Sequence, residues 1–478
     1  MYFWSMGNVR LKFCGAAQTV TGSSHLLELP NGKKVLLDCG LYQGNDDDMD
    51  NFNREFLFNP AELDAVVLSH AHIDHAGRIP KLVKEGFEGK IICTHATRDL
   101  CTIMLMDSAY LQVRDAKYEN KWRTKKGKKP IEPLYDEKDV RKALTHFVSI
   151  SYDGWYPVTG VEGVWLQFRD SGHILGAASV TLRITSDEHR PEFTLGFTGD
   201  IGRPERPILR DPAPMTQCDY IICESTYGDR LHDARDKELE QLLDIVNHTC
   251  VEKKGKLIIP AFSVGRTQEI VYLFDQLANE GKLPRIPIYV DSPLAINATE
   301  IFRMHPDCFD EDMMKYMMED PNPFGFNHLH YIKRVEDSKR LNHDETPAVI
   351  ISASGMITGG RIKHHVFNNI ENPRNTILMV GYAAPHTIGG QLRNQAKEIK
   401  MFGTKVKVNA EVKIMDSFSA HGDYQEMIDF LDNQDRDKLK KLFLVHGELK
   451  PQEHFKSELE KSGFDNIYIP HLGQEFVI

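Results

Sequence analysis

Short apolar runs follow one another from the start of the chain. Runs of strand length occupy residues 11–15, 25–29 and 34–40, and Pro30-Asn31-Gly32 separates the last two. An Asn-Gly pair between two such runs is typical of a tight hairpin turn. The pattern therefore predicts an antiparallel β meander, with Asp38 at the end of its last strand.

Strand and helix patterns then alternate up to about Glu224. The clearest apolar runs of strand length lie at residues 63–69, 163–168, 179–184 and 193–197. Many strands and few helices are typical of layered sheets with helices outside. We therefore predict an α/β (α+β) fold in which a sheet sandwich is flanked by helices.

The pattern changes after Tyr227, where amphipathic and buried segments alternate regularly. Helices are predicted at 237–253 and 267–281, and buried strands at 256–261, 286–290, 348–352 and 376–381. Such alternation indicates a parallel α/β unit. We therefore expect a first domain formed by residues 1–224 and 406–478, with residues 225–405 inserted into it.

Composition describes an ordinary globular chain. Its 478 residues are 41% hydrophobic, enough for a sizeable core, and no apolar run approaches the length of a membrane helix. The eight cysteines form no CxxC pair, which favours reduced thiols over disulfides or a zinc ribbon. We therefore expect a cytoplasmic protein.

Charge limits the way in which nucleic acid would be bound. The net charge of −11 argues against attraction by the whole surface, because phosphate binding normally leaves a basic footprint. One segment, Lys121–Lys129, is strongly basic and contains Trp122. Charge runs are usually solvated, so we interpret this segment as a solvated loop.

The most informative run is His70-Ala71-His72-Ile73-Asp74-His75, which lies between a predicted strand and a predicted helix at 77–86. Crowded imidazoles and a carboxylate are costly to bury unless a cation organises them. His70 and His72 can face one ion while Asp74 and His75 face a second. Nitrogen-rich ligation with some carboxylate suits zinc, with manganese or iron as competitors.

Two ions need further ligands, and three residues at strand ends are candidates. His173 lies in a glycine-flanked loop, Asp200 follows a strand and has two oxygens that can bridge both ions, and His446 ends another strand. A single histidine after a strand is more often structural. Together, however, the three complete two coordination shells.

These residues, with Asp38, resemble the metallo-β-lactamase superfamily, whose fold is a four-layer αββα sandwich. Three further motifs resemble those of its β-CASP subfamily of RNA-processing nucleases: Glu224-Ser225-Thr226-Tyr227-Gly228, Phe418-Ser419-Ala420-His421 and Val445-His446-Gly447-Glu448. The resemblance covers essentially the whole chain. It implies that the inserted unit is a β-CASP domain.

The resemblance also implies a role for each motif residue. Asp200 would bridge two zinc ions, while manganese is the alternative metal. The remaining ligands would be His70, His72 and His173 for one ion and Asp74, His75 and His446 for the other.

Four residues are implied in catalysis. Asp38 would orient the ligands, Asp74 would hold a metal, and Glu224 would hold His421 or His446 in place. His421 lies outside the ligand set, and we expect it to protonate the departing 3′-oxygen as general acid.

Substrate contacts are expected in the inserted domain, across a cleft from the core. Residues 260–268 and 352–361 resemble substrate-contacting loops, and a strand that runs into a helix offers backbone N–H groups to an anion. Phe262 or Tyr382 is a candidate to stack a base, although such aromatics are more often core residues. The other candidates are Arg266, Ser354, Gly355, Arg361 and His232.

The resulting hypothesis is a zinc-dependent phosphodiesterase that cuts single-stranded RNA by a two-metal mechanism, with endonucleolytic and 5′-exonucleolytic action both open. A hydrolase of a small ester, thioester or lactone is one alternative, although it would lack the large insertion. A catalytically silent RNA-binding scaffold is another, although it would have lost ligands. The expected partners are single-stranded RNA and, in a homodimer, a second copy of the chain, with no membrane.

Overall fold

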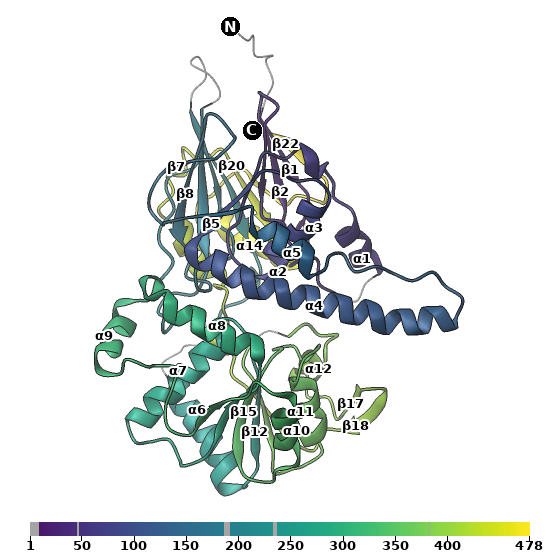
Figure 1. Ribbon diagram of the computed structural model, residues 1–478. Coiled ribbons are helices and arrows are strands. Elements are labelled where there is room, and N and C mark those ends of the chain that lie inside the picture. Colours follow the sequence, from purple (N-terminus) through teal and green to yellow (C-terminus); the bar gives the residue numbers. More distant parts are fainter. Residues whose placement is uncertain (1–8, 45–46, 186–191, 233–236, 382) are drawn as a thin grey trace. The chain divides into compact units, whose positions relative to one another are not determined.

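The computed structural model describes residues 9–44, 47–185, 192–232, 237–381 and 383–478 (Figure 1). These residues form two compact units. Unit 1 comprises residues 1–205, 210–231 and 421–478, and unit 2 comprises residues 206–209 and 232–420. The candidate residue Tyr382 lies outside the described residues.

The first sheet of unit 1 has seven strands. The order is β22 (Glu475–Val477), β1 (Arg10–Phe13), β2 (His25–Glu28), β3 (Lys34–Leu37), β4 (Ala65–Val67), β5 (Lys90–Thr94) and β6 (Phe147–Ile150). Strands β1 to β3 are antiparallel, which confirms the predicted meander. Its turn uses Gly32 at φ +79°, and Asn31 Oδ1 accepts from the Lys33 backbone N–H.

The second sheet of unit 1 also has seven strands. The order is β21 (Ile467–Tyr468), β20 (Lys441–Val445), β11 (Tyr220–Glu224), β10 (Phe193–Phe197), β9 (Ala178–Ile184), β8 (Val164–Asp170) and β7 (Tyr156–Pro157). A single buried core joins Phe13 and Leu27 of the first sheet to Phe168, Leu182 and Phe443 of the second. The two sheets therefore pack face to face.

Helices cover the outer faces of this sandwich. On the second sheet, α13 (Tyr424–Leu431) and α14 (Leu449–Lys461) share a core with β11 and β20. On the first sheet, the long helix α4 (His95–Lys125) contacts β5 and β6. The other helices of unit 1 are α1 (Asp47–Arg54), α2 (Ile73–Ala76), α3 (Ile79–Lys84) and α5 (Glu137–Leu144). The four-layer αββα prediction is confirmed.

Unit 2 is built on a parallel sheet. Its order is β14 (Leu329–Tyr331), β13 (Ile288–Val290), β15 (Ala348–Ser352), β12 (Lys256–Pro260), β16 (Thr376–Met379) and β19 (Glu411–Ile414). A separate hairpin pairs β17 (Glu398–Met401) with β18 (Thr404–Lys407). The helices are α6 (Glu238–Val246), α7 (Arg266–Asn279), α8 (Pro293–Met304), α9 (Glu311–Glu319), α10 (Val335–His343), α11 (Ile362–Asn369) and α12 (Ile388–Arg393). This arrangement confirms the predicted parallel α/β unit.

Two features were not expected. Strand β19, which lies beyond residue 405, pairs with β16 and completes the sheet of unit 2. Residues 121–125 belong to α4 rather than to a loop. That helix starts at Thr94, whose side chain accepts from the Thr97 N–H, and no glycine or proline interrupts it before Gly127.

Two further properties complete the description. No helix among the described residues is long and apolar enough to cross a membrane. All eight cysteines are buried as free thiols. Burial raises the pKa of Cys39 to about 12, which disfavours the reactive thiolate form.

Candidate metal centre

The histidine-rich run lies where a buried strand ends. After β4 the chain passes through Ser69 and His70, which are fully buried, and then forms the single-turn helix α2, which carries Asp74 and His75. Two other strands end at the same place in unusual conformations: Asp38 follows β3 with φ +57°, and His446 follows β20 with φ +54°. Left-handed backbone at non-glycine residues is concentrated at functional sites.

The first group of candidate ligands contains three imidazoles and one carboxylate. His72 Nδ1 lies 3.2 Å from His70 Nε2 and 3.1 Å from His173 Nε2. Asp200 Oδ2 lies 3.4 Å from His70 Nε2 and 3.3 Å from His173 Nε2. These four side chains present their ligand atoms to one point.

The second group contains Asp74, His75 and His446. His75 Nε2 lies 3.1 Å from His446 Nε2, which is 3.5 Å from Asp74 Oδ2. The other oxygen of Asp200, Oδ1, lies 3.2 Å from His75 Nε2. Asp200 therefore turns one carboxylate oxygen toward each group, and Oδ1 is buried with no hydrogen-bond partner among the described residues.

Hydrogen bonds fix which ring nitrogen each histidine presents. Asp38 Oδ2 lies 2.6 Å from His75 Nδ1, so this nitrogen donates and Nε2 is the ring nitrogen that faces the centre. Ser69 Oγ donates to Asp38 at 2.9 Å and therefore accepts from His70 Nδ1 at 3.0 Å. Both histidines thus turn Nε2 toward the centre, and Nε2 is the atom that would bind a metal.

Thr226 gives His446 the same orientation. Its hydroxyl donates to Glu224 Oε2 at 2.6 Å and accepts from His446 Nδ1 at 3.0 Å. His446 Nε2 then faces the second group with its lone pair. The sequence prediction assigned no role to Thr226, although it lies inside the motif that begins at Glu224.

Three histidines of the first group are in the neutral form that a cation requires. Burial lowers the pKa of His72 to about 3 and also lowers the pKa values of His70 and His173, which keeps these rings neutral. Burial opposes ionisation of Asp200, but the imidazoles of His446 and His75 hold its pKa well below the usual range. Burial opposes protonation of His75, but the carboxylates of Asp200 and Asp38 raise its pKa well above the usual value, so a metal bound here would displace a proton from this ring.

His421 lies beside the ligand groups, next to Glu224. Its Nδ1 is 3.1 Å from Glu224 Oε2 and 3.9 Å from Asp200 Oδ2. Glu224 is buried and is itself held by the backbone N–H of Ile201. Burial opposes protonation of His421, but the two carboxylates raise its pKa to about 9. His421 is therefore protonated at neutral pH.

The predicted substrate residues Arg266, Ser354, Gly355 and Arg361, together with His232, belong to unit 2. The Arg266 guanidinium is buried, pairs with Glu269 and lies 5.0 Å from the Phe418 ring.

Arg361 donates to buried Asp291 at 2.5 Å and to the carbonyl oxygens of Ile332 and Lys333. These internal contacts give Arg361 a structural task in addition to the phosphate contact predicted for it. The phosphate contact stays a prediction.

The two remaining loop positions adjoin each other. Ser354 Oγ accepts from the Thr358 backbone N–H at 3.1 Å, which closes the turn after β15. A Cβ at Gly355 would lie 3.1 Å from the ring of Phe262, so glycine allows this close approach. The Phe262 ring is 42% exposed and therefore accessible to a base. Half-buried His232 lies before α6.

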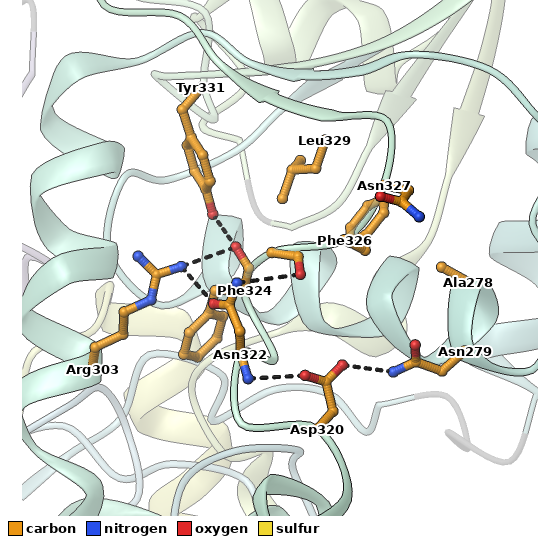
Figure 2. A pocket seen from close by; sticks show the side chains of 11 residues that line it. Ala278, Asn279, Arg303, Asp320, Asn322, Phe324, Phe326, Asn327, Leu329 and Tyr331 are labelled. Atoms are coloured by element: carbon orange, nitrogen blue, oxygen red, sulfur yellow. Dashed lines mark hydrogen bonds between the residues drawn. The ribbon is translucent and has the colours of Figure 1, made fainter.

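A pocket in unit 2 offers a different chemistry. It has a volume of about 700 Å³, and Figure 2 shows the side chains that line it. Its polar groups pair with one another: Arg303 donates to Asn322 Oδ1 at 2.9 Å, and Asn279 donates to Asp320 at 2.8 Å. Its lining contains no histidine or cysteine, so it does not compete with the cluster in unit 1 as a metal centre.

The fold and the cluster define a metal-dependent hydrolase of the metallo-β-lactamase type. Residues 18–150 match the metallo-β-lactamase superfamily, residues 267–392 the Beta-Casp domain, and residues 405–470 the Zn-dependent metallo-hydrolase RNA specificity domain. The chain belongs to the β-CASP family of this superfamily. The prediction made from the motifs is thereby confirmed.

Several relatives share almost the full length of the chain. The ribonuclease TTHA0252 of Thermus thermophilus is 36% identical, over 91% of this chain and 92% of its own. An RNase J-like protein of Methanocaldococcus jannaschii is 32% identical, over 97% of this chain and 99% of its own. The transcription termination factor FttA of Methanosarcina mazei is 32% identical, over 92% of this chain and 67% of its own.

A solved structure shares the fold. A protein of unknown function from Enterococcus faecalis V583 aligns with a TM-score of 0.53 over 99% of this chain and all of its own, at 12% identity. This similarity concerns the fold alone.

Proposed function

We propose that this protein is a metal-dependent ribonuclease that hydrolyses single-stranded RNA with two zinc ions. The observation that carries the two-metal proposal is the placement of Asp200, whose two oxygens face two separate groups of ligand atoms. Ribonuclease action is supported by the RNA specificity domain match and by the relatives named as ribonucleases.

The proposed ligand sets follow the two groups. Each contains two or three imidazoles and shares the carboxylate of Asp200, a donor set that suits zinc, with manganese as the alternative. The first is His70, His72 and His173, and the second is Asp74, His75 and His446. Two such ions acidify a water molecule and stabilise the charge that develops on the phosphodiester oxygens.

The residues around the ligands prepare the site for this reaction. Asp38 holds His75 through Nδ1 and holds His70 through Ser69, so both rings are oriented before substrate arrives. Glu224 holds His446 through Thr226 and contacts His421 directly. One buried carboxylate thus positions a ligand and the proposed acid together.

His421 is the proposed general acid. With Nδ1 hydrogen bonded to Glu224, the proton on Nε2 is the one transferred to the leaving 3′-oxygen. Its raised pKa keeps that proton in place at neutral pH until the P–O bond breaks. We further propose that residues 260–268 and 352–361 contact the substrate through their backbone N–H groups. Arg266, Ser354, Gly355, Arg361 and His232 are the candidates within or near these loops.

The two alternatives receive no support from the comparisons. The family matches extend over the insertion as well as the core, which a small-molecule hydrolase would not need. All seven proposed ligand positions carry ligating side chains, whereas a silent scaffold would have lost some.

The test combines metal content with cleavage. Zinc-loaded protein is incubated with three labelled single-stranded RNA substrates. Two are linear and carry a 5′-triphosphate or a 5′-monophosphate, and the third is circular and has no 5′ end. Cutting of the circle shows endonuclease action, whereas a strict dependence on the 5′ end shows exonuclease action.

Variants connect cleavage to the proposed residues. Asp74→Ala and His421→Ala should abolish cutting, while His471→Ala, an exposed histidine of unit 1, should leave it unchanged. Undiminished cutting by both of the first two variants would remove the assignment.

A further inference from the structure

Among the described residues, the second half of α4 is covered on one side only. The loop that follows the helix folds back along it: Asn120 Nδ2 donates to the Ile131 carbonyl oxygen at 2.9 Å, and Arg123 Nε donates to the Lys129 carbonyl oxygen at 2.7 Å. Ala116 is buried on the same side. Figure 1 shows the end of α4 projecting away from the sheets of unit 1, with the following loop returning to α5. The helix therefore has an opposite face without such cover.

That face carries aromatic and basic side chains in alternation. Each member has another member three or four residues away, so together they lie on one side of the helix, and all are exposed. The exposed fractions of the three rings are 56%, 65% and 54% for Tyr110, Tyr118 and Trp122. We call this face the α4 stripe, and it comprises Tyr110, Arg114, Lys117, Tyr118, Lys121, Trp122 and Lys125.

The charge of the stripe is opposite to that of the protein. The stripe has four cations and no carboxylate, and residues 110–129 contain eight basic and two acidic residues in a chain of net charge −11. The two acidic residues border the stripe and are paired: Asp115 with Arg114 at 3.4 Å and Glu119 with Arg123 at 3.2 Å. The stripe is therefore a local attractive site for an anion.

We propose that the α4 stripe binds single-stranded RNA. Exposed rings offer stacking surfaces to unpaired bases, and the interleaved cations match the phosphates between them. Lys125 Nζ lies 5.3 Å from the centre of the Trp122 ring, so a cation and a ring already act together at the end of the stripe. From Tyr110 to Lys125 the helix rises about 22 Å, which is long enough for several nucleotides.

The composition of the stripe favours RNA over a membrane surface. A helix that lies in a membrane interface separates an apolar face from a charged face, whereas here rings and cations share one face. The stripe also has no aliphatic side chain to insert among lipids. A double helix is disfavoured for another reason, because its bases are not available for stacking.

This inference rests on the proposed function, which supplies the identity of the ligand, single-stranded RNA. It adds to that function a binding surface on α4. None of the stripe residues belongs to the candidate metal ligands, so the stripe would hold the strand without taking part in its cleavage. Binding to the stripe can therefore be measured without any cutting. A protein that binds RNA through α4 but does not cleave it would refute the proposed function alone.

The experiment measures the affinity for a short fluorescein-labelled oligoadenylate by fluorescence anisotropy, in an Asp74→Ala background that does not cut it. Trp122→Ala should raise the Kd about tenfold, and Tyr118→Ala combined with it about a hundredfold. Trp122→Phe, which keeps a stacking ring, should restore most of the affinity. The matched control is Trp165→Ala, which removes a 42% exposed tryptophan from β8 of the same unit.

Each outcome decides the proposal. Weaker binding in the α4 variants, with unchanged circular dichroism and an unaffected control, supports it. Equal affinity of Trp122→Ala and its background overturns it. Equal losses for oligoadenylate and for a duplex of the same length also overturn it, because stacking requires unpaired bases. The proposal is also overturned if Trp122→Ala weakens binding to phosphatidylglycerol vesicles but leaves binding to RNA unchanged.

Discussion

Asp275 is a buried carboxylate in unit 2 whose charge the fold does not favour. It lies on α7 with its side chain fully buried, and its Oδ1 has no hydrogen-bond partner among the described residues. Tyr316 donates to Oδ2 at 2.6 Å. Burial is the largest influence and raises the pKa of Asp275 from 3.8 to about 7, with Asp320 nearby acting in the same direction.

The replacement Asp275→Asn should therefore stabilise unit 2 above pH 7. Because the folded pKa exceeds the unfolded one, the folded state binds more protons between about pH 4 and pH 7, and wild-type stability falls as the pH rises through that window. A difference of about three pKa units corresponds to at most about 4 kcal/mol at pH 8. Asparagine removes this cost while its Oδ1 still accepts from Tyr316.

The assay is thermal unfolding of wild-type and Asp275→Asn protein at pH 4 and pH 8. The variant should unfold several degrees higher at pH 8 and at nearly the same temperature at pH 4, since a gain of 1 kcal/mol is worth about 2–4 °C in a unit of this size. Asp429→Asn, an exposed aspartate on α13, is the control and should give no gain at either pH. A variant that gains equally at both pH values, or loses stability at pH 8, would refute the reasoning.

Further predictions concern the metal centre, unit 2 and assembly. Thr226→Val breaks the link from Glu224 to His446 and should weaken zinc binding about 10- to 100-fold in a chelator competition; unchanged affinity would show that the link is dispensable. Arg361→Ala removes the guanidinium that pairs with buried Asp291. The free energy of unfolding, measured in urea, should fall by about 2–4 kcal/mol. Full stability with weaker RNA binding would instead indicate that Arg361 contacts a phosphate of the RNA. Removing metal with EDTA should lower the unfolding temperature, zinc should restore it, and an unchanged temperature would argue against bound metal. The homodimer is tested by light scattering, in which a mass of 54.6 kDa would show a monomer.

The candidate ligands were predictable because they follow apolar strands. A buried strand such as β4 is visible as a run of Ala, Val and Leu, and the side chains that follow it must lie at a sheet edge. His70, His72, Asp74 and His75 stand out because four potential metal ligands lie within six residues. His173, Asp200 and His446 can be recognised as candidate ligands only when they are considered together.

Other features depend on contacts between distant residues. Thr226 acts on His446, which is far away in sequence, and Arg361 pairs with Asp291 of another loop. The helical state of residues 121–125 was not visible because this end of α4 packs almost no apolar side chains, so its sequence has no apolar periodicity. The pairing of β19 with β16 was not visible because β19 is half exposed and short.

The most direct test of the account is the rate of single-stranded RNA cleavage as zinc is added to metal-free protein. Cutting should rise with zinc and reach its maximum at about two ions per chain, because Asp200 joins two ligand groups that are both needed. A maximum at one ion per chain would contradict the two-metal centre, and the absence of cutting at every zinc level would contradict the ribonuclease itself.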